Sequence, residues 1–149
     1  MTVTESLRQN LLQVLMLPTQ AVDWLLMLWN AIQVFDDVAD GDPVDRANLD
    51  GAIWDTLVAM NQNTFFLKNS DLLAPCLALT VMKWQASDRI ERAGKADARS
   101  FVWRAGYYDV VLMAVQICHG AKFANDNAHL VIELYGETFE DYMREFSHA

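Results

Sequence analysis

The chain of 149 residues is poor in cysteine, proline, glycine and basic side chains. Its two cysteines, Cys76 and Cys118, are too few for a disulfide-rich scaffold and lack the close spacing of metal or redox motifs. Three prolines and six glycines exclude a collagen-like or loop-dominated chain. We therefore expect two buried thiols in a reducing compartment, and we place the protein in a cytoplasm.

Positive charge is also scarce, since 11 basic side chains face 20 acidic ones and the formal net charge is −9. Phosphate groups and anionic lipids repel such a chain, so we expect neither nucleic acid nor a membrane as partner. The most apolar run, 22–35, is too short for a membrane span, which needs about 20 residues, and predicts a buried helix. The first twenty residues lack the pattern of a secretory signal.

The chain is rich in apolar residues and in residues that begin and end helices. A hydrophobic fraction of 53% over this length predicts a single compact domain, 1–149. Strand signals are poor, because β-branched residues occur singly among Leu, Met and Ala. Caps and breakers predict an all-α bundle of six or seven helices. We expect them at about 2–17, 19–38, 44–60, 70–94, 96–118 and 121–135, with a short last helix after Thr138.

Two of these helices, 19–38 and 96–118, are so apolar that we expect both at the centre of the bundle. The aromatic side chains are numerous and include five tryptophans. They fit either a core or a contact surface. A domain of this length cannot easily bury five tryptophans, so we expect a homo-oligomer in which some of them lie at a subunit contact.

An acidic cluster ends the first of the two apolar helices. Asp36, Asp37 and Asp40 follow Phe35, and helical spacing lets the three carboxylates point into one space. They repel one another and oppose the negative end of the helix dipole. Carboxylate oxygens are natural ligands of Mg²⁺, so the cluster predicts a cation site that would also attract phosphate oxygens. The alternative is a solvated acidic helix end before Pro43.

The segment Asp36-Asp37-Val38-Ala39-Asp40 resembles the aspartate-rich DDxxD motif of the class I isoprenoid (terpenoid) synthases. A second stretch, 125–133, has the spacing of that family's second metal motif. The resemblance implies an all-α fold with Mg²⁺ held by Asp36, Asp37, Asp40, Asn125, His129 and Glu133. It also implies a prenyl diphosphate or similar diphosphate-containing small molecule as ligand. His129 stands where the family has a hydroxyl residue, and the chain is shorter than the family's catalytic domain.

Six of the eleven cationic side chains lie between Lys83 and Arg104. Among them Arg89, Arg92 and Arg99 are candidates to bind the diphosphate, because guanidinium groups make bidentate contacts to phosphate. The alternative is a solvated connection between helices, in which these arginines pair with acidic neighbours.

Two functions remain open from the sequence. The first is a divalent-metal-dependent diphosphate-binding domain, and neither motif identifies a catalytic side chain for it. The second is a non-enzymatic helical accessory or assembly protein that acts by self-association or partner binding. It requires an exposed aromatic patch and no convergent polar cavity.

Overall fold

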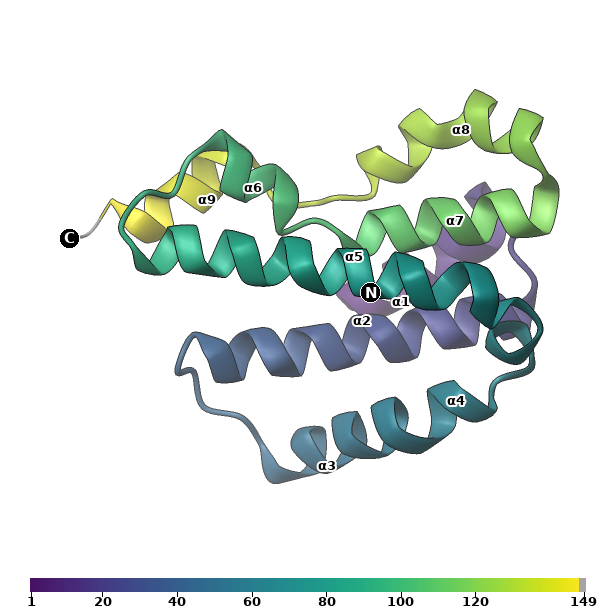
Figure 1. Cartoon of the computed structure of the whole chain (residues 1–149), viewed down its shortest axis with the longest axis horizontal. Coiled ribbons are helices and arrows are strands. Elements are labelled where there is room, and N and C mark those ends of the chain that lie inside the picture. Colours follow the sequence, from purple (N-terminus) through teal and green to yellow (C-terminus); the bar gives the residue numbers. More distant parts are fainter. Residues whose placement is uncertain (148–149) are drawn as a thin grey trace. The chain divides into compact units, whose positions relative to one another are not determined.

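A computed structural model describes residues 1–147 and confirms the all-α expectation (Figure 1). Helix accounts for 81% of the chain, and residues 1–147 contain no strand. The helical segments of this part of the chain outnumber the six or seven that were expected. One reason is that two expected helices, 2–17 and 44–60, contain π-helical stretches. The other is that the expected helix 96–118 is broken.

The chain divides into two compact units, 1–70 and 71–149, and the second is described up to Ser147. The expectation of one domain over the whole chain stays a prediction.

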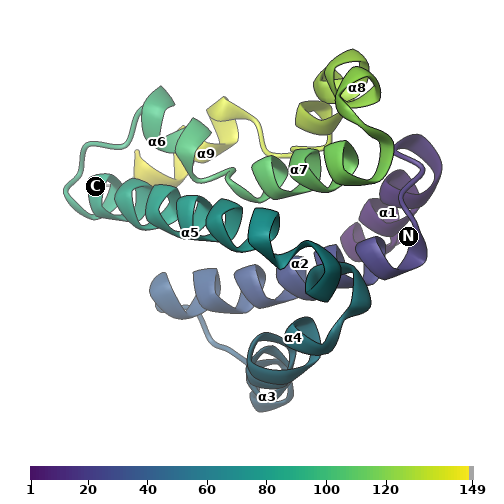
Figure 2. The ribbon, with the colours of Figure 1, turned by 45° about the vertical axis from the view of Figure 1, so that its right-hand side comes forward.

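The first unit is built around α2 (Thr19–Ala39). The other segments of this unit are α1 (Val3–Gln9), η1 (Asn10–Val14), α3 (Arg46–Trp54), η2 (Asp55–Ala59), α4 (Met60–Gln62) and the start of α5 (Thr64–Arg92). The segment α3–η2–α4 is a continuous helical run that lies beside α2 (Figures 1 and 2). The two segments η1 and η2 are π-helical, a form often found at functional sites.

Local capping residues and Pro18 account for where the first helices of this unit begin. Thr2 and Glu5 form the expected capping box, with Glu5 N donating to Thr2 Oγ1 at 3.1 Å and Thr2 N to Glu5 Oε2 at 2.9 Å. The expected cap Thr19 is instead the first residue of α2, after Pro18. Trp24 is fully buried, and its ring stacks on Phe66 with centroids 5.5 Å apart.

The second unit contains the rest of α5 together with α6 (Ala98–Trp103), α7 (Tyr107–His119), α8 (Ala121–Glu133) and α9 (Phe139–Phe146). A kink at Asn69 (φ −128°, ψ 19°) interrupts α5 one residue before the expected start at Ser70. Helices α7 and α8 form a hairpin at Gly120, whose φ of 89° suits glycine (Figure 2). Thr138 caps α9 as expected, accepting from Asp141 N at 3.1 Å.

The expectation of two very apolar central helices is not matched. The expected helix 96–118 is broken at 104–106 into α6 and α7, and at the break Thr80 Oγ1 donates to the Gly106 carbonyl at 3.2 Å. A Cβ at Gly106 would lie 3.0 Å from Thr80 Cγ2, a tight contact that glycine avoids where α7 begins beside α5. Among the described helices only α5 is long and apolar enough, by length and composition, to cross a membrane.

Candidate functional site

The predicted acidic cluster lies at the C-terminal end of α2. Asp36 is half-buried, while Asp37 and Asp40 are exposed, and Asp40 is the C-cap of the helix. Asp40 N donates to Asp36 O at 2.9 Å, and Asp42 N donates to Asp37 O at 2.9 Å. The three carboxylates therefore sit on a well-formed helix end, as the sequence predicted.

Asp37 also borders a cavity of about 470 Å³ formed by α1, α2, α3 and the start of η2. The polar side chains around it are those of Thr4, Asn30, Gln33, Asp37, Asn48 and Asp55. Burial raises the pKa of the Asp55 carboxyl above its ordinary value. No cationic residue lines this cavity. Its walls therefore carry two carboxylates, those of Asp37 and Asp55.

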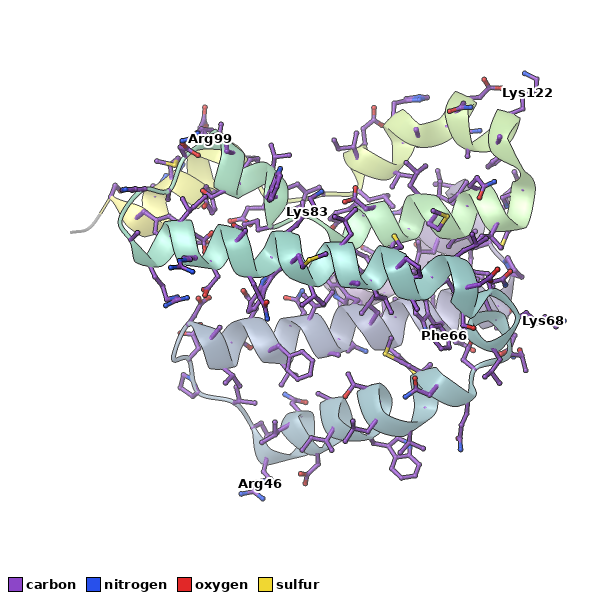
Figure 3. The ribbon with its side chains drawn as sticks, in the orientation of Figure 1. Arg46, Phe66, Lys68, Lys83, Arg99 and Lys122 are labelled. Atoms are coloured by element: carbon purple, nitrogen blue, oxygen red, sulfur yellow. The ribbon has the colours of Figure 1, made fainter. Side chains whose placement is uncertain are left out.

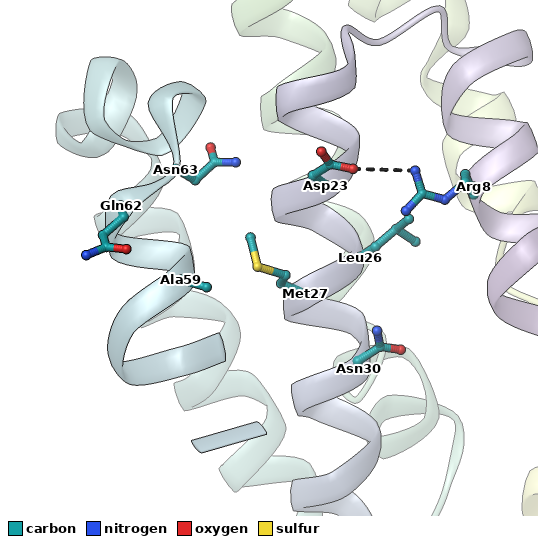
Figure 4. A pocket seen from close by; sticks show the side chains of 8 residues that line it. All are labelled: Arg8, Asp23, Leu26, Met27, Asn30, Ala59, Gln62 and Asn63. Atoms are coloured by element: carbon teal, nitrogen blue, oxygen red, sulfur yellow. Dashed lines mark hydrogen bonds and ion pairs between the residues drawn. The ribbon is translucent and has the colours of Figure 1, made fainter. Parts of the chain in front are cut away.

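A second cavity of the first unit, also of about 470 Å³, lies between α1, α2 and the α4–α5 turn (Figure 4). Arg8 Nη1 lies 3.4 Å from Asp23 Oδ1, so the charges on its wall compensate each other. Asn63 uses its amide internally, since Nδ2 donates to Gln20 O at 3.0 Å and Oδ1 accepts from Phe66 N at 3.0 Å. This cavity therefore presents little free polar chemistry.

The second predicted metal motif lies on α8 in the second unit. Asn125, His129 and Glu133 are all exposed there, and their spacing places them along one side of a continuous helix. Asp126 instead pairs with Lys122 at 3.0 Å. Nowhere in residues 1–147 do three His, Cys, Asp or Glu side chains gather closely enough to hold a metal ion. The convergence of this motif with the acidic cluster stays a prediction.

The basic segment is largely paired with acidic neighbours of its own unit. Arg92 Nε lies 2.9 Å from Asp88 Oδ2, and Lys83 Nζ lies 2.7 Å from Asp109 Oδ2. Arg99 Nε and Nη2 donate hydrogen bonds of 3.0 and 2.8 Å to Asp97 Oδ2. These hydrogen bonds hold the pKa of the Asp97 carboxyl below its usual range. Figure 3 shows that Lys83 on α5 and Arg99 on α6 lie apart from each other.

Arg89 differs from the other two candidate phosphate ligands. It is exposed and has no ion pair with any described residue. The pairing of Arg92 and Arg99 favours the alternative of a helix connection with internal ion pairs. Of the three arginines, only Arg89 has no acidic partner among the described residues.

The most unusual surface lies on α5 between residues 71 and 89. Its exposed side chains, here called the outer face of α5, are Leu72, Ala74, Pro75, Ala78, Leu79, Val81, Met82 and Gln85. Leu79 is 51% and Met82 61% exposed, although large apolar side chains normally lie inside. Only 17% of the most apolar stretch of α5 is buried.

The opposite side of α5, its inner face, makes the polar contacts of the helix. Lys83 binds Asp109 on α7, and Ser87 Oγ donates to Ser100 O on α6 at 2.7 Å. Glu91 Oε2 accepts from Tyr142 Oη on α9 at 2.7 Å. The helix thus turns several polar side chains toward its own unit and leaves apolar ones outside, the reverse of an ordinary surface helix.

Sequence analysis missed the outer face because apolar residues occur on both sides of α5. Comparisons with protein families, with curated proteins and with solved structures find no match to this chain. The resemblance to isoprenoid synthases therefore stays a prediction.

Proposed function

We propose that the protein is a helical assembly protein that binds a second copy of itself through the outer face of α5. The observation that carries this proposal is the exposure of Leu72, Leu79, Val81 and Met82 on one helix. Contiguous exposed apolar patches of this kind mark interaction sites. Burying them in a contact removes apolar surface from water at about 25 cal/mol per Å².

The spacing of the outer face favours a helix as the partner. Leu72, Pro75, Leu79 and Met82 alternate steps of three and four residues, the repeat of a helix–helix seam. Small side chains, Ala74 and Ala78, flank this seam and allow close approach of a second helix. A matching helix is present in every copy of the chain, so self-association needs no additional component.

A membrane is a poorer partner for the same helix. The inner face of α5 carries the Lys83–Asp109 ion pair and the Glu91–Tyr142 hydrogen bond. A spanning helix would have to take these groups into hydrocarbon, at a cost of several kcal/mol each. The net charge of −9 also disfavours an anionic lipid surface.

The test is the mass of the protein in solution over a range of concentrations. We expect a dimer whose dissociation constant rises about tenfold or more with Leu79→Lys, because a charge enters the centre of the seam. Ile132→Lys is the matched control, since Ile132 on α8 is also exposed, at 67%. A native protein that is monomeric at all concentrations, or a control variant that weakens association equally, would overturn the proposal.

Divalent-cation and diphosphate binding remains the second candidate. The observation in its favour is that Asp37, a member of the DDxxD-like segment, shares a cavity with the half-buried Asp55. Neither carboxylate has a hydrogen bond or ion pair with a described residue. A cation between them would replace the missing partners, with Thr4 and Asn48 supplying further oxygen atoms.

Titration with Mg²⁺ or Mn²⁺ tests this second candidate. If the cation binds, it raises the unfolding temperature, because a ligand of the native state stabilises that state by mass action. Asp37→Asn should abolish the shift, whereas Asp50→Asn, an exposed carboxylate on α3, should leave it intact. No shift with millimolar cation would leave only the solvated helix end.

A further inference from the structure

Resting on the proposed self-association, we infer that two copies pack their α5 helices antiparallel, with Asp71 of each copy paired with Arg89 of the other. This inference fixes the direction of the contact and the residues that select it. It follows from the positions of the two charges at the ends of the outer face.

Asp71 and Arg89 lie on the same side of α5. They are eighteen residues apart, and eighteen residues make five full turns at about 3.6 residues per turn. Both side chains are exposed, and they are separated along the helix by about 27 Å. Every outward residue between them is apolar apart from Gln85. The outer face is therefore an apolar strip with a negative charge at one end and a positive charge at the other.

Neither of these charges has an ion pair within the described part of the chain. The neighbouring charges on α5 are occupied, since Lys83 pairs with Asp109, Arg92 with Asp88 and Glu91 with Arg104. Asp71 and Arg89 thus flank the outer face without an ion-pair partner among the described residues, and each can pair with a partner outside its own chain.

The sign of the two charges selects the orientation. A parallel pair would place Asp71 beside Asp71 and Arg89 beside Arg89, and like charges repel. An antiparallel pair places opposite charges together at both ends, once for each copy, as a two-fold axis requires. Charge pairs of this kind decide orientation and partner choice more than they add affinity.

The apolar strip also matches itself in this orientation. When Asp71 meets Arg89, the two-fold axis passes at the level of residue 80. Ala78 then lies near Met82 of the partner copy, and Leu79 lies near its Val81. The small Ala78 thus faces the large Met82, an arrangement that lets two helices interdigitate, and Leu79 and Val81 form an apolar pair.

Charge reversal tests the orientation. Asp71→Arg and Arg89→Asp should each weaken the dimer about fivefold to tenfold at low salt, because each creates two like-charge pairs. The double variant should restore the native dissociation constant, and salt should reduce all these differences. Lys122→Asp on α8 changes the net charge as Arg89→Asp does and should have no such effect.

Cross-linking provides a second reading that does not depend on affinity. After Cys76 and Cys118 are replaced by serine, one sample carries Asp71→Cys and the other Arg89→Cys. Mixed and oxidised, they should form a disulfide between the two variants, and each variant alone should not. Cross-links within the Asp71→Cys sample alone would show a parallel pair and overturn the inference.

The two proposals fail in different ways. If Leu79→Lys dissociates the dimer while charge reversal has no effect, the antiparallel pairing is wrong and self-association through α5 stands. If the native protein never dimerises, both are wrong.

Discussion

At the scale of single residues, one buried contact holds three helices of the second unit together. Tyr142 on α9 is fully buried, and its Oη lies 2.6 Å from Ser100 Oγ on α6 and 2.7 Å from Glu91 Oε2 on α5. Burial raises the pKa of the Tyr142 phenol, and so does its hydrogen bond to Glu91. The guanidinium of Arg104 lies over the same ring, 5.1 Å from its centroid.

Removing the Tyr142 hydroxyl should therefore destabilise the protein. We expect Tyr142→Phe to lower the free energy of unfolding by about 1–3 kcal/mol, because Glu91 and Ser100 lose a buried partner. Tyr135→Phe is the matched control, since its hydroxyl makes only a 3.4 Å contact with Glu137. Urea unfolding of both variants measures the difference. If both variants lost the same free energy of unfolding, the buried hydrogen bonds of Tyr142 would contribute no more to stability than the 3.4 Å contact of Tyr135.

For Asp55 we expect a substitution to stabilise the protein, in contrast to Tyr142→Phe. Burial raises its pKa, so folding favours the neutral form and the ionised carboxylate at neutral pH is penalised. The stability linked to this group is present at low pH and lost as the pH rises through its folded pKa. Asp55→Asn should stabilise the protein at pH 7, by roughly 0.5 kcal/mol.

The control for this change is Asp50→Asn, which alters an exposed carboxylate of α3. The gain from Asp55→Asn should shrink toward acid pH, where the native carboxyl is already protonated, and Asp50→Asn should show neither effect. Thermal unfolding at several pH values provides the measurement. A destabilising Asp55→Asn at pH 7 would show that the carboxylate has a favourable partner.

At the scale of helices, caps set the ends and tertiary contacts decide how the helices are used. Thr138 supplies the side-chain cap of α9, the short helix that carries Tyr142. Thr138→Ala should cost about 1 kcal/mol, while Thr138→Ser should keep most of the stability because it retains the hydroxyl. Chemical denaturation of the two variants measures this difference. An alanine variant as stable as the serine variant would contradict the role of the cap.

The same contrast explains how much of the fold the sequence predicts. Some helix ends depend only on neighbours in the chain and can be predicted from the sequence. Examples are the capping box at Thr2, the stop before Pro18 and the cap at Thr138. The break between α6 and α7 lies where Thr80 of another helix contacts Gly106, and the local pattern did not predict it.

The candidate sites follow the same rule. The positions of Asp36, Asp37 and Asp40 at a helix end follow from the local sequence. The shared cavity of Asp37 and Asp55 depends on how α3 packs beside α2, which the sequence does not state. The exposure of the outer face of α5 could not be predicted either, because only tertiary packing decides which apolar side of that helix is covered.

At the scale of the whole molecule, the aromatic side chains are divided unevenly. All four tyrosines, 107, 108, 135 and 142, lie in the second unit, and burial raises the pKa of each. For Tyr108 the folded value is about 12, against an ordinary value of 10.0. We therefore expect alkaline pH to destabilise the second unit, because its buried phenols lose their protons there.

Raising the pH should consequently unfold the protein. A phenol whose folded pKa is raised contributes stability below the unfolded pKa and loses it as the pH climbs through the folded one, so the loss begins near pH 10 and is complete for Tyr108 near pH 12. For Tyr108 alone the full loss is about 2–3 kcal/mol. Tyrosinate absorbance should appear together with the loss of helical signal, because the phenols ionise on exposure. Tyr108→Phe should move the alkaline transition to higher pH. If the phenols ionise near pH 10 while the protein keeps its helices, they are not buried and the prediction is wrong.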